Sequence, residues 1–109
     1  MVSSADVLIE NYRPGVMERF GLGAAALSLR YPRLIYLSMP GFASEDPQQE
    51  GMRAWEAAIM AAGGVFSDMG LNRVLMGVNP CYSALPLAST YSASLGAYAV
   101  TLALFAREA

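Results

Sequence analysis

Apolar residues in the first part of the chain form short continuous runs. The run at residues 6–12 carries Val-Leu-Ile, and residues 34–39 are apolar and rich in strand-forming side chains. Runs of this kind, each followed by Pro-Gly, are typical of strands in a parallel sheet. Residues 16–20 and 24–30, which lie between the two runs, have helical composition. They predict a helical connection from the first strand to the second. The pattern therefore predicts a βαβ unit with parallel strands over about residues 6–42.

The second part of the chain, about residues 52–109, has a helical and loop pattern. Residues 55–62 predict a helix from their Ala-rich composition, and residues 74–78 are compatible with a short strand. A long helix is predicted from near residue 86 to residue 108. Residues 84–106 lack charge and are long enough to span a bilayer, but the Ser and Thr side chains near their start disfavour insertion. A buried core helix is the better prediction.

Length and composition bound the possible classes of protein. The 109 residues suffice for one small domain, and the 55% hydrophobic and 15% charged content excludes a disordered tail. The apolar excess indicates surfaces meant for another domain or subunit. The seven cations are all arginines, scattered without a basic stripe, so nucleic-acid binding is not expected.

The titratable side chains exclude some chemistry. The chain has no histidine, so no mechanism that needs imidazole is available to it. The single cysteine, Cys81, has no internal disulfide partner and no zinc-ligand spacing, and the N-terminus does not have the pattern of a signal peptide. A cytoplasmic protein without a metal site is therefore expected.

Specific stretches of the sequence resemble one protein family. Residues 6–22, with the core Glu-Asn-Tyr-Arg-Pro-Gly, closely resemble a signature of the class III CoA-transferases of CaiB/BaiF type, which include formyl-CoA transferase and α-methylacyl-CoA racemase. Residues 32–42, the Trp-Glu pair with its Ala/Gly-rich helix, and the region from residue 86 to the end resemble the stretches that follow it. The resemblance covers nearly the whole chain in the family's order.

The resemblance implies a fold and an architecture. The fold class is α/β, with parallel strands and covering helices from part of a Rossmann-like large domain, and residues 1–109 form a single partial segment of it. Family subunits are several times longer and interlock as dimers. The chain is therefore expected to be an internal fragment or a degenerate member. Its partner would be the missing remainder of a larger subunit or a second copy.

The resemblance also implies a set of residues that bind coenzyme A or acyl-CoA. Arg19 and Arg53 fall on the basic positions that contact CoA, and Val16 falls on the position that lines the adenine. Asn11 and Tyr12 belong to the same binding signature. Arginine suits phosphate because it is always charged and offers a fork of donors. The alternative is that both arginines are solvated surface charges.

The catalytic position departs from the family pattern. Family members form acyl intermediates on an Asp that follows a Pro-apolar-small run, and here Ser89 stands at that position. Because a hydroxyl needs a base, the chain is predicted to be inactive in CoA transfer between an acyl-CoA and a carboxylic acid. Racemisation is disfavoured too, since Trp55 replaces the family's histidine. Glu56 either orients the substrate or is a helix N-terminal acid favoured by the dipole.

Three hypotheses for the function follow. The first is a degenerate transferase-family member that keeps part of a CoA-ester-binding surface and lacks the nucleophile. The second is an active transferase whose carboxylate comes from another chain or from a missing segment. The third is a non-catalytic interaction or scaffold domain.

Overall fold

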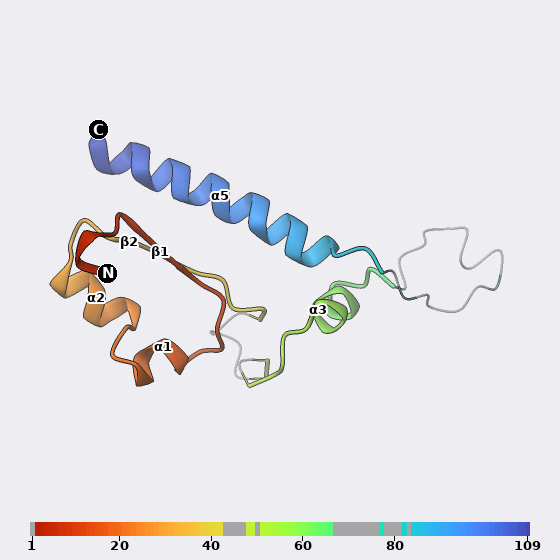
Figure 1. Ribbon diagram of the computed structural model, residues 1–109. Helices are drawn as coiled ribbons and strands as arrows, with labels where there is room; N and C mark the ends of the chain where they lie inside the picture. The colour runs from red at the N-terminus through yellow and green to blue at the C-terminus, as the bar shows by residue number, and fades with distance from the viewer. Residues whose placement is uncertain (1, 43–47, 50, 67–76, 78–81, 83) are drawn as a thin grey trace.

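The computed structural model describes residues 2–42, 48–49, 51–66, 77, 82 and 84–109. Cys81 and most of the possible strand at residues 74–78 lie outside these residues. Figure 1 shows the elements in chain order: η1 (Val2–Ser4), β1 (Val7–Glu10), α1 (Val16–Arg19), α2 (Ala24–Arg30), β2 (Ile35–Ser38), α3 (Glu56–Ala62) and α5 (Leu87–Glu108).

The two strands form the parallel pair that the sequence predicts. β1 and β2 run parallel, with Val7 opposite Ile35 and Glu10 opposite Ser38. β1 takes four residues of the stretch 6–12 and β2 takes four of the stretch 34–39. Gly15 has φ +80°, which favours glycine, and it turns the chain from β1 into α1.

Helices lie on both sides of the strand pair. In Figure 1, α5 runs along one side, and α1 and α2 lie on the other. The contact between α5 and β2 is close at Gly96, where an added Cβ would lie 2.8 Å from Met39 Sδ and 3.2 Å from Leu37 Cδ2. Gly96 is the buried residue of α5, so its lack of a side chain allows the helix to approach the strand.

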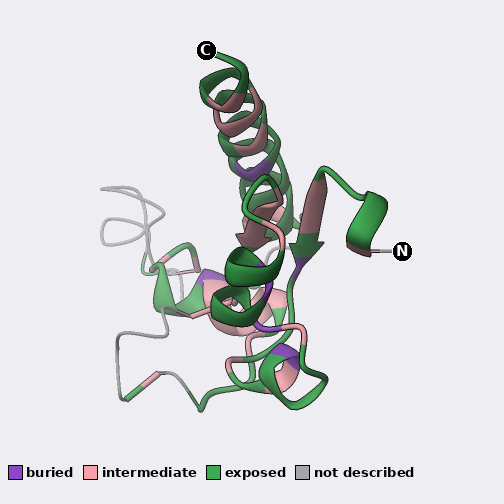
Figure 2. Cartoon of the chain, turned by 90° about the vertical axis from the view of Figure 1, so that its left-hand side faces the viewer, coloured by how far each residue is buried: buried purple, intermediate pink, exposed green. Residues whose placement is uncertain are grey.

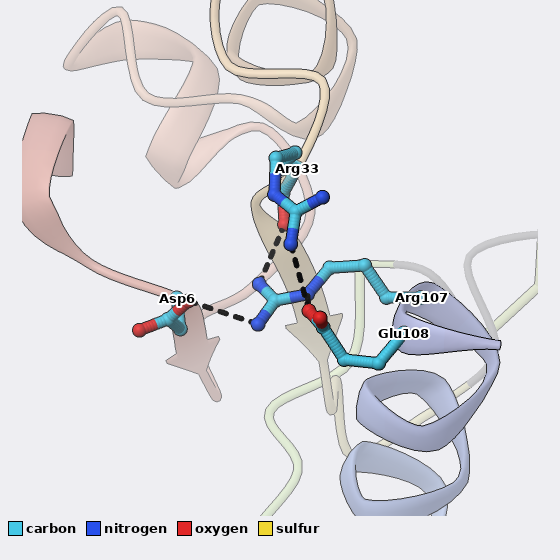
Figure 3. A network of polar contacts seen from close by, with 4 residues as sticks. All are labelled: Asp6, Arg33, Arg107 and Glu108. Atoms are coloured by element: carbon cyan, nitrogen blue, oxygen red, sulfur yellow. Dashed lines mark hydrogen bonds and ion pairs between the residues drawn. The ribbon is translucent and has the colours of Figure 1, made fainter.

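A polar network fixes the other end of α5 to the strand pair (Figure 3). The Arg107 guanidinium donates to the Arg33 carbonyl at 3.0 Å and forms ion pairs with Asp6 at 2.9 Å and Glu108 at 3.0 Å. Arg33 in turn bonds Glu108 at 2.7 Å. Because Asp6 precedes β1 and Arg33 precedes β2, the network links both strands to the last turn of the helix.

The described part of the chain buries few side chains. Its buried apolar side chains are Met17, Leu27 and Met60, each on a different helix. The radius of gyration is 17.8 Å, against about 13 Å for a compact domain of this length. Figure 2 shows exposed residues along most of the drawn helices and strands, so the described residues do not close a core of their own.

The prediction of a buried core helix is wrong for α5 within this chain. Its Gly96 side contacts β2, while a stripe of large apolar side chains is 50–75% exposed: Tyr91, Leu95, Tyr98, Leu102 and Phe105. By length and composition α5 also qualifies as a membrane span, a test that core helices of other proteins pass as well. The expected surface for another domain or subunit is consistent with this stripe.

Candidate functional site

A cavity of about 530 Å³ lies at the ends of the two parallel strands. Four segments line it: residues 11–14 after β1, residues 39–42 after β2, residues 52–56 leading into α3, and the first turns of α5 from Ala88 to Ala93. The region beyond the carboxyl ends of parallel strands is where α/β proteins commonly bind ligands. The parallel pairing therefore positions both strand-end loops at one site.

The base of the first loop is fixed by the buried carboxylate of Glu10. Its Oε2 accepts a bond from the Tyr12 backbone N–H at 2.7 Å, and its Oε1 accepts a bond from the Ser38 hydroxyl. The second bond crosses from β1 to β2, so Glu10 ties both strands together just before the cavity. Sequence reasoning placed Glu10 in the signature without a role. The sequence signal for such a role is the position of Glu10, an acidic residue directly after the apolar residues of the first strand.

The first residue of α3 meets the N-terminus of α5 inside the cavity. Glu56 Oε1 accepts a bond from the Ala88 backbone N–H at 2.7 Å, and Oε2 accepts one from the Ser89 backbone N–H at 3.0 Å. The Ser89 hydroxyl also donates to Oε2. Glu56 thus caps two of the free N–H groups that every helix N-terminus presents. Sequence reasoning considered both residues but did not pair them.

These donors shift the protonation equilibrium of Glu56. The Ser89 hydroxyl bond, opposed in part by desolvation and supported by the two backbone bonds, holds the pKa of the carboxyl below its ordinary value of 4.5. The charged form of Glu56 is therefore the form that the site stabilises at neutral pH. Among the described residues that line the cavity, Glu56 is the one acidic side chain, and it supplies negative charge there.

Two arginines line the same cavity. Arg53 precedes α3, and Arg13 follows the Asn-Tyr pair. In the described part of the chain the ion pairs join Asp6, Arg107, Arg33 and Glu108, so neither cavity arginine has an ion-pair partner there. Their charges are therefore available to an anionic ligand. Sequence reasoning missed Arg13, although it lies inside the signature stretch.

The structure brings together most of the predicted site residues and leaves two apart. Asn11, Tyr12, Arg53, Glu56 and Ser89 all line the cavity. The two others lie on α1, where Val16 is half-buried and Arg19 is exposed, and neither lines it. Among the described residues, no group of three His, Cys, Asp or Glu side chains could hold a metal ion.

Comparison with known proteins assigns the family. All of residues 1–109 match the model of CoA-transferase family III, and the chain belongs to that family. It is 52% identical over 108 residues to the CoA-transferase/lyase DddD of Marinomonas sp., covering 99% of this chain and 13% of that protein. It is 35% identical over 109 residues to the succinyl-CoA–L-malate CoA-transferase beta subunit of Chloroflexus aurantiacus, covering 99% of this chain and 26% of that subunit.

A solved structure gives the fold match. Rv3272 of Mycobacterium tuberculosis superposes with a TM-score of 0.84 at 30% identity, over 98% of this chain and 29% of that one. The predicted α/β class is therefore confirmed. The chain spans less than a third of the length of each of these proteins. The expectation of a fragment is consistent with this coverage.

Proposed function

We propose that the chain forms part of the acyl-CoA site of a class III CoA-transferase subunit, which moves CoA between an acyl-CoA and a carboxylic acid. One observation carries the proposal: a single cavity gathers Asn11, Tyr12, Arg53, Glu56 and Ser89 from separate segments of the chain. The acyl thioester would lie at the Glu56–Ser89 end. The cavity arginines would contact phosphate groups of CoA.

The shape and charge of the cavity support this assignment. Its volume of about 530 Å³ falls within the usual range for small-molecule sites, about 300–1,000 Å³. CoA is longer than such a cavity and carries several phosphates, so part of it would extend beyond the cavity mouth. Arg19, which lies on α1 outside the cavity, would contact the part of CoA that extends beyond the mouth.

Isothermal titration calorimetry with acetyl-CoA tests the binding proposal. We expect Arg53→Ala to weaken binding about tenfold, because one charge-assisted hydrogen bond contributes about 1.4 kcal/mol. Arg30→Ala is the matched control: Arg30 is an exposed arginine on α2 that does not line the cavity. Absent binding, or equal affinity of the parent and Arg53→Ala, would refute the proposal.

Position 89 has a narrower role in this proposal. The Ser89 hydroxyl donates to the Glu56 carboxylate, so Ser89 is a neutral donor in this structure, whereas the family's Asp supplies an ionised carboxylate. The inactivity expected from the sequence remains a prediction. That prediction rests on Ser89 standing at the Asp position, and in the structure the Glu56 carboxylate from α3 contacts this residue.

A second candidate function is an interaction domain that docks through α5. The exposed apolar stripe of α5 favours it, because such a face is expected to be covered by the remainder of a subunit or by a second copy. Sedimentation of the chain with and without Leu102→Glu decides this candidate. It would replace the first if the chain associates through the stripe and binds no acetyl-CoA.

A further inference from the structure

The Glu56 carboxylate lies beside residue 89, the position that the resemblance assigns to the family's nucleophilic Asp. It reaches both the backbone N–H and the hydroxyl of Ser89, and it is half-buried in the cavity wall. A thioester carbonyl placed against residue 89 therefore lies beside Glu56 as well. No shift of the helices is required to bring this carboxylate to the site.

The two oxygens of Glu56 are not equivalent. Oε2 accepts two bonds, both from Ser89, which occupies its two lone pairs. Oε1 accepts the single bond from the Ala88 N–H and keeps a free lone pair. The structure thus leaves one carboxylate oxygen able to attack and holds the other in place.

We propose that Glu56 is the catalytic carboxylate of this chain, and that its Oε1 attacks the thioester carbonyl carbon of a bound acyl-CoA. This inference rests on the proposed function, because it needs acyl-CoA in the cavity. Ser89 is the positioning residue that holds Glu56 through Oε2.

The step balances without any co-reactant. The Oε1 lone pair forms the new C–O bond, the C–S bond breaks, and its electron pair leaves with sulfur as the CoA thiolate. The product is a mixed anhydride between Glu56 and the acyl group. In that anhydride Oε2 is the carbonyl oxygen of Glu56, and the two Ser89 donors polarise it. They would stabilise the oxyanion when a thiolate or water attacks the Glu56 carbonyl carbon and releases the acyl group as its acid.

The competing nucleophile is the Ser89 hydroxyl with Glu56 as its base. The hydroxyl proton already points to Oε2, so the geometry permits this transfer. The lowered pKa of Glu56 disfavours it, because a weakly basic carboxylate gives little driving force for removing a proton from a hydroxyl. The same shift keeps Glu56 ionised and ready for direct attack.

Hydroxylamine trapping identifies the acylated residue. The chain is incubated with acetyl-CoA and hydroxylamine, and peptide mass spectrometry maps the hydroxamate that an acyl-anhydride leaves on a carboxyl side chain. We expect the hydroxamate on Glu56, with a loss of at least tenfold in Glu56→Gln. Ser89→Ala should lower the yield several-fold and leave its position unchanged. Glu18→Gln, which removes an exposed carboxylate outside this cavity, should match the parent.

Three outcomes would overturn the inference. An acyl ester on Ser89, abolished in Ser89→Ala, would assign the hydroxyl as nucleophile. Absence of any adduct while calorimetry shows acetyl-CoA bound would leave the proposed function standing and remove only the role of Glu56. Absence of binding would remove both. Circular dichroism of Glu56→Gln checks its fold, and Glu56→Asp, which keeps the carboxylate on a shorter side chain, should retain hydroxamate formation at a reduced rate.

Discussion

Replacing Arg107 with alanine tests how the last turn of α5 is held to the strand pair. The Arg107 side chain is 17% exposed, whereas Asp6 and Glu108, its two acidic partners, are 73% and 61% exposed. Its charged bond to the Arg33 carbonyl is worth about 1.5 kcal/mol. The two ion pairs are largely solvated and together add about 0.5 kcal/mol. We expect Arg107→Ala to lower the free energy of unfolding by about 2 kcal/mol.

Arg33→Ala is the matched comparison for that variant. The Arg33–Glu108 pair has side chains 71% and 61% exposed, so its loss should cost less than about 1 kcal/mol. The variant keeps the Arg33 carbonyl and hence the main bond to Arg107. Urea unfolding of parent and variants measures both effects, with the slope m unchanged. Equal losses in the two variants, or a loss below about 0.5 kcal/mol for Arg107→Ala, would refute the reasoning.

Two further predictions concern the walls of the cavity. Gly41→Ala should lower the urea midpoint by the equivalent of about 1–3 kcal/mol, because the added Cβ would lie 1.9 Å from Ala54 Cβ. Gly51→Ala is the control. An added Cβ at Gly51 has no atom within 4 Å, so the midpoint should not change. Folding lowers the pKa of Glu56, so its stabilising effect is present above its ordinary pKa of 4.5 and is lost as pH falls through the folded value. The difference in urea midpoint between parent and Glu56→Gln should therefore disappear in acid, and a difference that persists there would contradict this.

The sequence by itself determined the local elements and the family. Each strand is predicted by a continuous apolar run and its Pro-Gly end, and α2 and α3 by composition within a few residues. These patterns depend on residues that are neighbours in the sequence. The elements therefore form as predicted although few of the described side chains are buried. The signature from Glu10 to Arg19 resembles the family at the level of residue identity, and the comparisons confirm it.

Only the tertiary structure decided which side chains meet. Glu56 and Ser89 are 33 positions apart, and no local pattern states that the first turn of α3 faces the N-terminus of α5. The exposure of α5 is equally non-local. Its apolar composition predicts burial, but burial requires a neighbouring surface, and within the described residues the stripe of large apolar side chains stays exposed. Composition determines whether a side chain favours burial, whereas tertiary packing determines whether another surface is there to cover it.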